Sequence, residues 1–213
     1  MQTAKRAVLF ANGQAKPGFE VSLLPDDFLI AVDGGLRHLK RLRQPPHLLI
    51  GDMDSVEAED LEQALNAGVE VRRFPPAKDQ TDLELALEYA LTRGYVHVII
   101  AYPFGDRADH TFGNLNLRSR PELAGKTLLL DDGQVEVRLL SSSALIPTQP
   151  GELISLFAWG SPVEGIVTSG LEYPLADESL VPWQARGISN VALGDSIELH
   201  FKSGRLLVIR TRL

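Results

Sequence analysis

The sequence contains no cysteine, which excludes disulfide bonds and thiolate metal ligands. It also has no apolar run close to the roughly 20 residues that a membrane-spanning helix needs. The first residues, MQTAKRAVLFANG, hold only a short apolar run before Asn and Gly, which is typical of a first strand and not of a signal peptide. A formal net charge of −7 argues against general nucleic-acid binding. We therefore expect a cytoplasmic protein without a membrane or nucleic-acid partner.

The composition itself is ordinary for a globular protein, because 44% of the 213 residues are hydrophobic and the length allows one large domain or two small ones. The first part of the chain alternates apolar runs with helical patterns. It predicts a doubly wound, mostly parallel α/β sheet with helices on both faces. The expected strands are residues 7–11, 28–32, 47–50, 69–74, 96–102 and 127–131. The expected helices are residues 35–42, 56–68 and 81–94, with Gly94 as the stop signal of the last one.

The pattern changes near residue 134, after which short alternating segments are separated by Gly, Pro, Ser and Asp. No convincing helical pattern remains, so this part predicts an antiparallel β-sandwich or a small barrel, and we favour the sandwich. The turn-rich stretch SSSALIPTQPG marks the seam, which places the two domains at residues 1–138 and 139–213. The expected strands are residues 134–140, 152–159, 163–168, 196–201 and 205–211.

Unusual polar groups follow each of the first five predicted strands. Ligands of a parallel α/β sheet bind outside the carboxyl ends of its strands, so these groups are expected to share one site. They are Asn12 and Gly13 in ANG, Asp33, Gly34 and Gly35 in VDGG, Asp52, Asp54 and Ser55 in GDMDS, Lys78, Asp79, Thr81 and Asp82 in KDQTD, and Arg107, Asp109 and His110 in GDRADH.

The stretch GDMDS is the most informative of the five, because its two carboxylates flank a single residue at a strand exit. Like charges at this spacing repel each other unless a cation lies between them. Oxygen ligands without cysteine or clustered histidine favour Mg²⁺ over Zn²⁺. The other motifs also have structural interpretations: DGG is a common turn, KDQTD can cap a helix through Asp79 or Thr81, and GDRADH can hold an Arg–Asp ion pair. Their expected meeting at one sheet edge favours a functional site.

Taken in order, ANG, VDGG, GDMDS, KDQTD, GDRADH and, late in the chain, GLEYPL with GISN resemble the thiamine pyrophosphokinase family. The resemblance covers nearly the whole chain and includes the change from an α/β to a β pattern. It implies a homodimer that uses ATP and Mg²⁺, transfers a diphosphate to the hydroxyl group of thiamine, and releases AMP.

Such a transfer spreads charge over several phosphate oxygens, which proteins stabilise with metal ions and fixed cations. The expected Mg²⁺ ligands are Asp52, Asp54 and Asp82. The expected catalytic residues are Lys78 and Arg107 on the transferring phosphates, Asp79 as a further metal ligand or proton acceptor, and Asp109 as the residue that orients Arg107 or binds metal. The nucleotide pocket is expected to contain Asn12, Gly13, Asp33, Gly34, Gly35, Ser55, Thr81 and His110.

The resemblance also implies that the β domain supplies Tyr173, Ser189 and Asn190 to thiamine, across a dimer interface. An aromatic face suits the flat aminopyrimidine, and hydroxyl and amide groups can bind the edges of its ring. Without the resemblance, GLEYPL predicts a plain strand with a core tyrosine and GISN predicts a turn. Two positions depart from the family pattern: Asp106 replaces the second Gly of Gly-Gly-Arg-x-Asp-His, and Tyr173 replaces the Trp of some members.

Three other functions compete with this interpretation. A Mg²⁺-dependent phosphohydrolase would use one aspartate of Asp-x-Asp as a nucleophile, but such enzymes place the pair after their first strand, whereas two strands precede it here. A non-catalytic nucleotide or thiamine sensor could share the scaffold, although it would not need the charged set. A related pyrophosphokinase could act on a pterin alcohol instead of thiamine.

Overall fold

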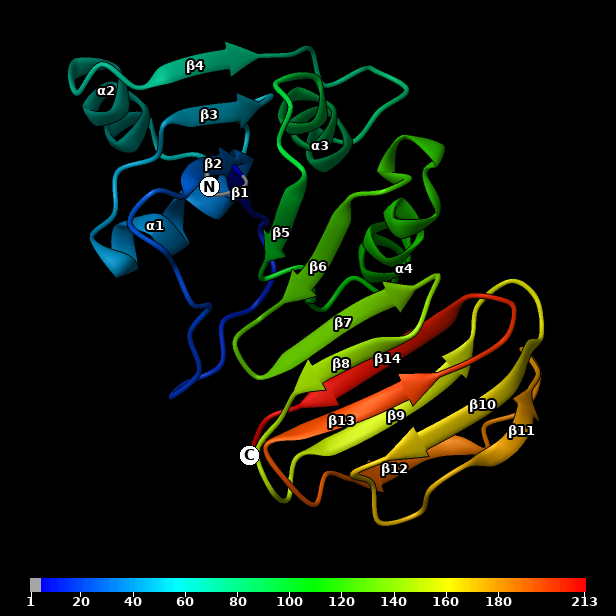
Figure 1. Ribbon diagram of the computed structural model, residues 1–213. Coiled ribbons are helices and arrows are strands. Elements are labelled where there is room, and N and C mark those ends of the chain that lie inside the picture. Colours follow the sequence, from blue (N-terminus) through cyan, green and yellow to red (C-terminus); the bar gives the residue numbers. More distant parts are fainter. Residues whose placement is uncertain (1–4) are drawn as a thin grey trace. The chain divides into compact units, whose positions relative to one another are not determined.

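Residues 5–213 are described in a computed structural model (Figure 1). The chain divides into two compact units, the first ending at Gly133 and the second running from Gln134 to Leu213. This division lies ahead of the predicted boundary at 138/139, which would cut through strand β7 (Val135–Leu140). Along its whole length β7 pairs with β14 (Leu206–Thr211), so it belongs to the second unit.

The first unit contains parallel strands in the order β6-β5-β1-β2-β3-β4 (Figure 1). From β1 the chain winds outward through β2, β3 and β4, and then returns to place β5 on the other side of β1. The loops after β1 and β5 therefore meet at a topological switch point, where doubly wound folds bind ligands. The strands are β1 (Arg6–Phe10), β2 (Phe28–Val32), β3 (Leu48–Gly51), β4 (Glu70–Arg73), β5 (His97–Ala101) and β6 (Thr127–Asp131).

Helices cover both faces of this sheet, as the sequence predicted (Figure 1). Leu39 of α1 and Ala64 of α2 share a core with Phe10 and Leu49, whose side chains point to one face. Helix α3 buries its Leu83, Ala86, Leu87 and Ala90 and contacts β1, β2 and β3, where it covers the opposite face. The helices are α1 (Leu36–Leu42), α2 (Ala58–Asn66), α3 (Asp82–Thr92) and α4 (Ala108–Asn116), with short 3-10 turns at Asp33–Gly35, Leu117–Ser119 and Pro121–Leu123.

The second unit is a β-sandwich of two antiparallel sheets, with strand orders β12-β9-β14-β7 and β11-β10-β13-β8. Ile154 and Val208 from one sheet share a buried cluster with Ile166 and Ile197 from the other, so the two sheets enclose a single core. The strands not yet located are β8 (Ala144–Pro147), β9 (Leu153–Ala158), β10 (Val163–Ser169), β11 (Ala176–Leu180), β12 (Gly187–Val191) and β13 (Ser196–His200).

Four elements lack a counterpart among the predicted ones. Helix α4 buries none of its residues, so it carries no apolar stripe that a pattern could reveal. Strands β8, β11 and β12 each stand at an end of a strand order. Strands β11 and β12 are rich in polar or turn-forming residues, and β8 is a four-residue apolar segment that ends in proline. The stretch taken as a seam contains β8, and GISN lies in β12 and not in a free turn. Within residues 5–213 no helix is long and apolar enough to cross a membrane.

Candidate active site

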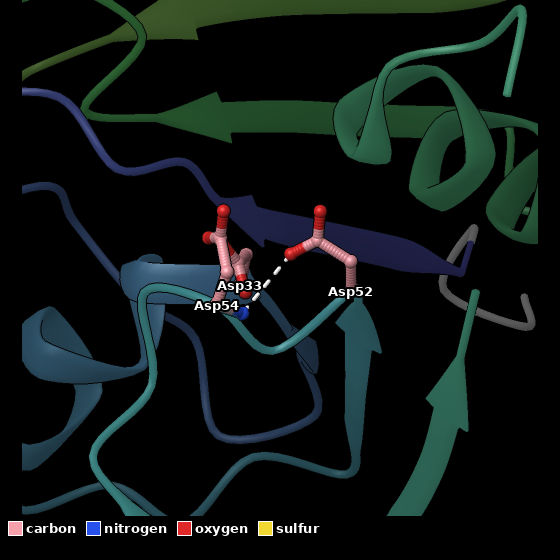
Figure 2. Close-up of side chains that lie close together, drawn as sticks. All are labelled: Asp33, Asp52 and Asp54. Carbon is pink, nitrogen blue, oxygen red and sulfur yellow. Dashed lines mark hydrogen bonds between the residues drawn. The ribbon is translucent and has the colours of Figure 1, made fainter. Parts of the chain in front are cut away.

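Three aspartates from neighbouring strand ends form an acidic cluster (Figure 2). Asp33 follows β2, and Asp52 and Asp54 follow β3, which pairs with β2 in parallel register. One carboxylate oxygen of each residue lies within 4.8 Å of the other two. Parallel pairing therefore brings together side chains that are about twenty positions apart in the sequence. We call Asp33, Asp52 and Asp54 the acidic cluster.

The backbone of these strand exits is folded tightly around the acidic cluster. Asp33 and Met53 both adopt left-handed conformations, with φ of 48° and 70°. Non-glycine residues rarely do so, and such conformations gather at functional sites. The Met53 N–H donates to Asp33 Oδ1 at 3.1 Å, and the Asp54 N–H donates to Asp52 Oδ1 at 3.0 Å. Gly51 has a φ of 153°, and a Cβ there would lie 2.9 Å from the Cβ of Asp33, so the close approach requires glycine.

The electrostatics of the acidic cluster favour the binding of a cation. Burial raises the pKa of Asp33, and the neighbouring charges of Asp52, Asp54 and Asp82 raise it further, against the lowering effect of a hydrogen bond with Ser55. The hydrogen bond that Ser55 Oγ donates to Asp54 at 2.8 Å is the main reason why the pKa of Asp54 is lowered. A divalent cation would relieve the repulsion, and its preferred ligands are carboxylate oxygens. The donor set thus fits Mg²⁺.

Asp82 was predicted as a metal ligand, but the structure pairs it with Lys78 outside the acidic cluster. Lys78 Nζ lies 3.1 Å from Asp82 Oδ1 and donates a hydrogen bond of 3.1 Å to the carbonyl of Pro75. The contact with Asp82 is an ion pair by distance and lacks hydrogen-bond geometry, so the buried Oδ1 has no hydrogen-bond partner in the described chain. Asp82 still raises the pKa of Asp33, and Lys78 helps to lower that of Asp54, which places both charges within reach of the acidic cluster.

Thr81 and Asp79 lie in the same loop, but only Thr81 has a structural role in helix α3. Thr81 is the N-cap of α3: its hydroxyl accepts from the Glu84 N–H at 3.2 Å, while its own N–H donates to Glu84 Oε2 at 2.8 Å. This reciprocal capping box is the structural interpretation of KDQTD. Asp79 is exposed. Gly94 ends the same helix in a left-handed conformation, as predicted.

The glycines of ANG and VDGG are explained by packing between strand exits. A Cβ on Gly13 would lie 2.2 Å from the Tyr102 carbonyl oxygen, and one on Gly35 would lie 1.8 Å from that of Phe10. On Gly34 it would lie 2.6 Å from the amide of Asn12. The prediction that these glycines line the nucleotide pocket stays a prediction, because close backbone packing already requires Gly13 and Gly35, and Gly34 packs against the Asn12 side chain.

Helix α1 fastens the loop that follows β1. Arg37 Nη2 donates to the Asn12 carbonyl at 3.0 Å and to the Gly13 carbonyl at 2.8 Å, and His38 Nε2 lies 2.9 Å from the same Gly13 oxygen. Burial is the main reason why the pKa of His38 falls to about 4. At neutral pH the imidazole is therefore uncharged, with its proton on Nε2 facing the Gly13 oxygen.

The loop after β5 carries Arg107 at the N-cap position of α4. Arg107 binds Asp109 in a fork, with Nε 3.2 Å from Oδ1 and Nη2 2.5 Å from Oδ2. This hydrogen bond is the main cause that lowers the pKa of Asp109 to about 2, and both side chains are exposed. Asp106, the departure from the family pattern, accepts a 2.6 Å hydrogen bond from Gln14 and so joins this loop to the loop after β1. His110 is exposed.

The residues predicted to bind thiamine lie together within the second unit. Asn190 is only 8% exposed, and its amide bridges the backbone of Tyr173: Oδ1 accepts from the Tyr173 N–H at 3.0 Å and Nδ2 donates to the Tyr173 carbonyl at 2.7 Å. The Tyr173 side chain is 64% exposed, so it is not the core tyrosine of a plain strand. Ser189 is exposed, with a φ of 59° at an irregularity of the β12–β9 pairing. Asn190 therefore holds the backbone from which the tyrosine ring projects.

Sequence reasoning assigned Asp33 to the nucleotide pocket and missed its membership of the acidic cluster. The adjacency of β2 and β3 was the signal that could have found it, since the carboxyl ends of consecutive parallel strands usually lie side by side.

The fold and the acidic sheet edge together define a class of protein, that of two-domain transferases of phosphate groups. Residues 21–128 match the family model described as thiamin pyrophosphokinase, catalytic domain, and residues 144–206 match the model of its vitamin B1 binding domain. The chain belongs to the thiamine pyrophosphokinase family.

Curated and solved relatives agree with this assignment. A thiamine pyrophosphokinase from Bacillus subtilis is 26% identical over 184 residues, which cover 85% of this chain and 86% of the relative. A crystal structure of thiamine pyrophosphokinase from Bacillus subtilis superposes with a TM-score of 0.85 over 98% of this chain and 99% of that one, at 24% identity. A thiamin pyrophosphokinase family protein from Enterococcus faecalis gives a TM-score of 0.83 over 98% and 100% of the two chains, at 26% identity. The predicted fold class is confirmed.

Proposed function

We propose that this chain transfers the diphosphate group of ATP to the hydroxyl of thiamine, giving thiamine diphosphate and AMP. The observation that carries the proposal is the acidic cluster of Asp33, Asp52 and Asp54 at the sheet edge, in a chain that belongs to this family. Lys78 and Arg107 follow strands of the same parallel sheet, so the loops that hold them leave from the same edge.

The acidic cluster would hold Mg²⁺ through Asp33, Asp52 and Asp54, with the unsatisfied Oδ1 of Asp82 as a further oxygen at this edge. When bound, the ion neutralises charge on the polyphosphate. Compared with the ligands predicted from the sequence, Asp33 takes the place of Asp82 among the three central Mg²⁺ ligands. It keeps Asp52 and Asp54 as they were predicted.

The side chains of this chain supply binding, orientation and a proton acceptor. Lys78 is held by Pro75 and Asp82, so its ammonium is fixed near the acidic cluster and can contact phosphate oxygens. Arg107 offers two parallel N–H donors, which suit a phosphate as well as they suit Asp109. Asp79 is exposed in the loop that follows β4, and we assign it as the acceptor of the proton that leaves the thiamine hydroxyl.

We propose that Tyr173 and Ser189, which are both exposed, contact the thiamine ring, and that Asn190 holds the Tyr173 backbone in place. We also propose a homodimer whose substrate sites draw residues from both protomers, because a small-molecule site usually buries most of its ligand. A cytoplasmic location suits a chain without cysteine.

The activity is tested by incubating the full chain with ATP, Mg²⁺ and thiamine and separating the nucleotides and thiamine esters by chromatography. Thiamine diphosphate and AMP in equal amounts are expected, and ADP with thiamine monophosphate would refute a diphosphate transfer. A hydroxymethyl pterin in place of thiamine tests the competing substrate. A denaturing quench with γ-labelled ATP tests the phosphohydrolase, which alone would retain label on the protein.

The shared site is tested by mixing an Asp54→Asn chain with a Tyr173→Ala chain after each has been purified. If the site is shared, the mixed dimer has one site with both intact residues and recovers part of the activity that each variant has lost. Full activity of a monomer would refute the shared site and leave the reaction untouched.

A further inference from the structure

Arg73 is the last residue of β4, at the sheet edge that carries the acidic cluster. The parallel register of β3 and β4 pairs Arg73 with Gly51, the residue before Asp52. The Arg73 Nε donates to the Asp52 carbonyl at 3.4 Å, so the side chain reaches from β4 to the residue that follows β3. Within residues 5–213, neither terminal nitrogen of Arg73 forms a hydrogen bond or an ion pair with a carboxylate. The side chain is exposed.

Two cations in the loops of this edge differ from Arg73, because each has an acidic partner. Lys78, the other cation that follows β4, is in an ion pair with Asp82, and Arg107 forms a fork with Asp109. Among residues 5–213 the one hydrogen bond of Arg73 goes to the backbone carbonyl of Asp52, a residue whose own carboxylate belongs to the acidic cluster. A backbone carbonyl leaves the positive charge of the guanidinium uncompensated, so the fork remains available for an anion that approaches the edge.

We propose that Arg73 is a phosphate-positioning residue: its guanidinium fork binds an oxygen of the polyphosphate substrate and aligns it over the acidic cluster. This inference rests on the proposed function and adds a residue that the sequence motifs do not contain. The physical reason is balance, since a polyphosphate that meets several carboxylates needs fixed cations around it as well as a metal ion. Arg forms two parallel hydrogen bonds to such a group, and these fix its orientation.

The neighbouring Arg72 provides a matched control. It lies on the same strand and is also exposed, but its Nε donates to Glu70 at 2.7 Å and its guanidinium lies 4.6 Å from the ring centre of Tyr89. Successive side chains of a strand point to opposite faces, so Arg72 has the same charge and a different direction. A difference in ligand affinity between the Arg72 and Arg73 variants is therefore due to the position of the side chain and not to the change in net charge.

The experiment compares Arg73→Gln, Arg73→Lys and Arg72→Gln with the parent chain in equilibrium binding of ATP, tripolyphosphate and adenosine, each with Mg²⁺. Arg73→Gln is expected to weaken binding of ATP and of tripolyphosphate about tenfold, the scale of one lost charge-assisted hydrogen bond. Adenosine binding should not change. Arg73→Lys should recover part of the loss, and Arg72→Gln should bind all three like the parent. The salt dependence of ATP binding should be shallower in Arg73→Gln, because one cation has been removed.

Unchanged ATP affinity in Arg73→Gln would overturn the inference, and so would equal losses in Arg72→Gln and Arg73→Gln. A lower melting temperature of Arg73→Gln with parental affinity would show that Arg73 only braces the end of β3. These outcomes are separate from the proposed function, which fails only if the parent chain makes no thiamine diphosphate from ATP and thiamine.

Discussion

Replacing Asp33 by Asn should stabilise the chain without metal and abolish its response to Mg²⁺. Asn keeps an oxygen that can accept the 3.1 Å hydrogen bond from the Met53 N–H, so the left-handed turn retains its partner. What the substitution removes is a partly buried negative charge beside Asp52, with carboxylate oxygens no more than 4.8 Å apart. At that distance two charges repel by about 1 kcal/mol in water and by more in a partly buried site. Repulsion from Asp54 acts in the same direction.

A change of about 1 kcal/mol corresponds to a rise in melting temperature of about 2–4 °C for a chain of this size. The measurement is thermal unfolding in EDTA and then in Mg²⁺ with ATP. In EDTA the Asp33→Asn variant should melt above the parent, and with Mg²⁺ and ATP the order should reverse, because ligand binding stabilises only the chain that retains the site. Asp26→Asn is the matched control, since Asp26 is exposed and precedes β2 at the other end of that strand.

The pH dependence gives an independent check on the sign. Because burial and neighbouring charge raise the pKa of Asp33, the folded state binds a proton more tightly than the unfolded state. The destabilising charge is fully present at neutral pH, and it is relieved as the pH falls through the raised pKa. The advantage of Asp33→Asn should therefore shrink over that window. A variant that melts below the parent in EDTA, or that keeps the full stabilisation by Mg²⁺, would contradict this prediction.

Arg107→Lys should lose more than tenfold in turnover with an unchanged melting temperature, since Lys lacks the fork and the Arg107–Asp109 pair is exposed; parental kinetics would reduce Arg107 to a structural ion pair. Thr81→Val should lower stability by about 1 kcal/mol through the lost N-cap, and Thr81→Ser should not, as measured by urea unfolding. Tyr173→Ala should raise the KM for thiamine and leave ATP affinity unchanged; equal changes for both substrates would contradict its assignment. Asn190→Ala should also raise that KM and additionally cost about 1–3 kcal/mol of stability, because the Tyr173 backbone loses its partners.

Local signals in the sequence were sufficient for much of the fold. The runs at 28–32 and 127–131 coincide with β2 and β6, because buried parallel strands are continuous apolar segments. Helix α3 lies between Thr81 and Gly94, where capping chemistry and the helical stripe agree. The polar loops after five strands were recognisable for the same reason: such residues stand out directly after an apolar run.

The elements that escaped prediction carry little of the apolar periodicity on which a prediction from sequence depends. Helix α4 buries no side chain, and the end strands β11 and β12 pair on one side only and are rich in polar residues. Strand β8 is only four residues long, with Ile146 as its one buried residue, which is too short for a periodic pattern. The same loss of information affected the domain boundary. Only the pairing of β7 with β14 assigns residues 135–138 to the second unit.

At the sheet edge, the residue types could be predicted from the sequence, because strand direction and loop position follow from the alternation of elements. Which of these side chains contact one another depends on the tertiary structure. Parallel pairing of β2 with β3 brought Asp33 into the acidic cluster, an ion pair drew Asp82 to Lys78, and the register of β4 carried Arg73 to the end of β3. Side chains approach each other through distances of a few ångströms, and such distances depend on register and backbone conformation, which spacing along the chain does not encode.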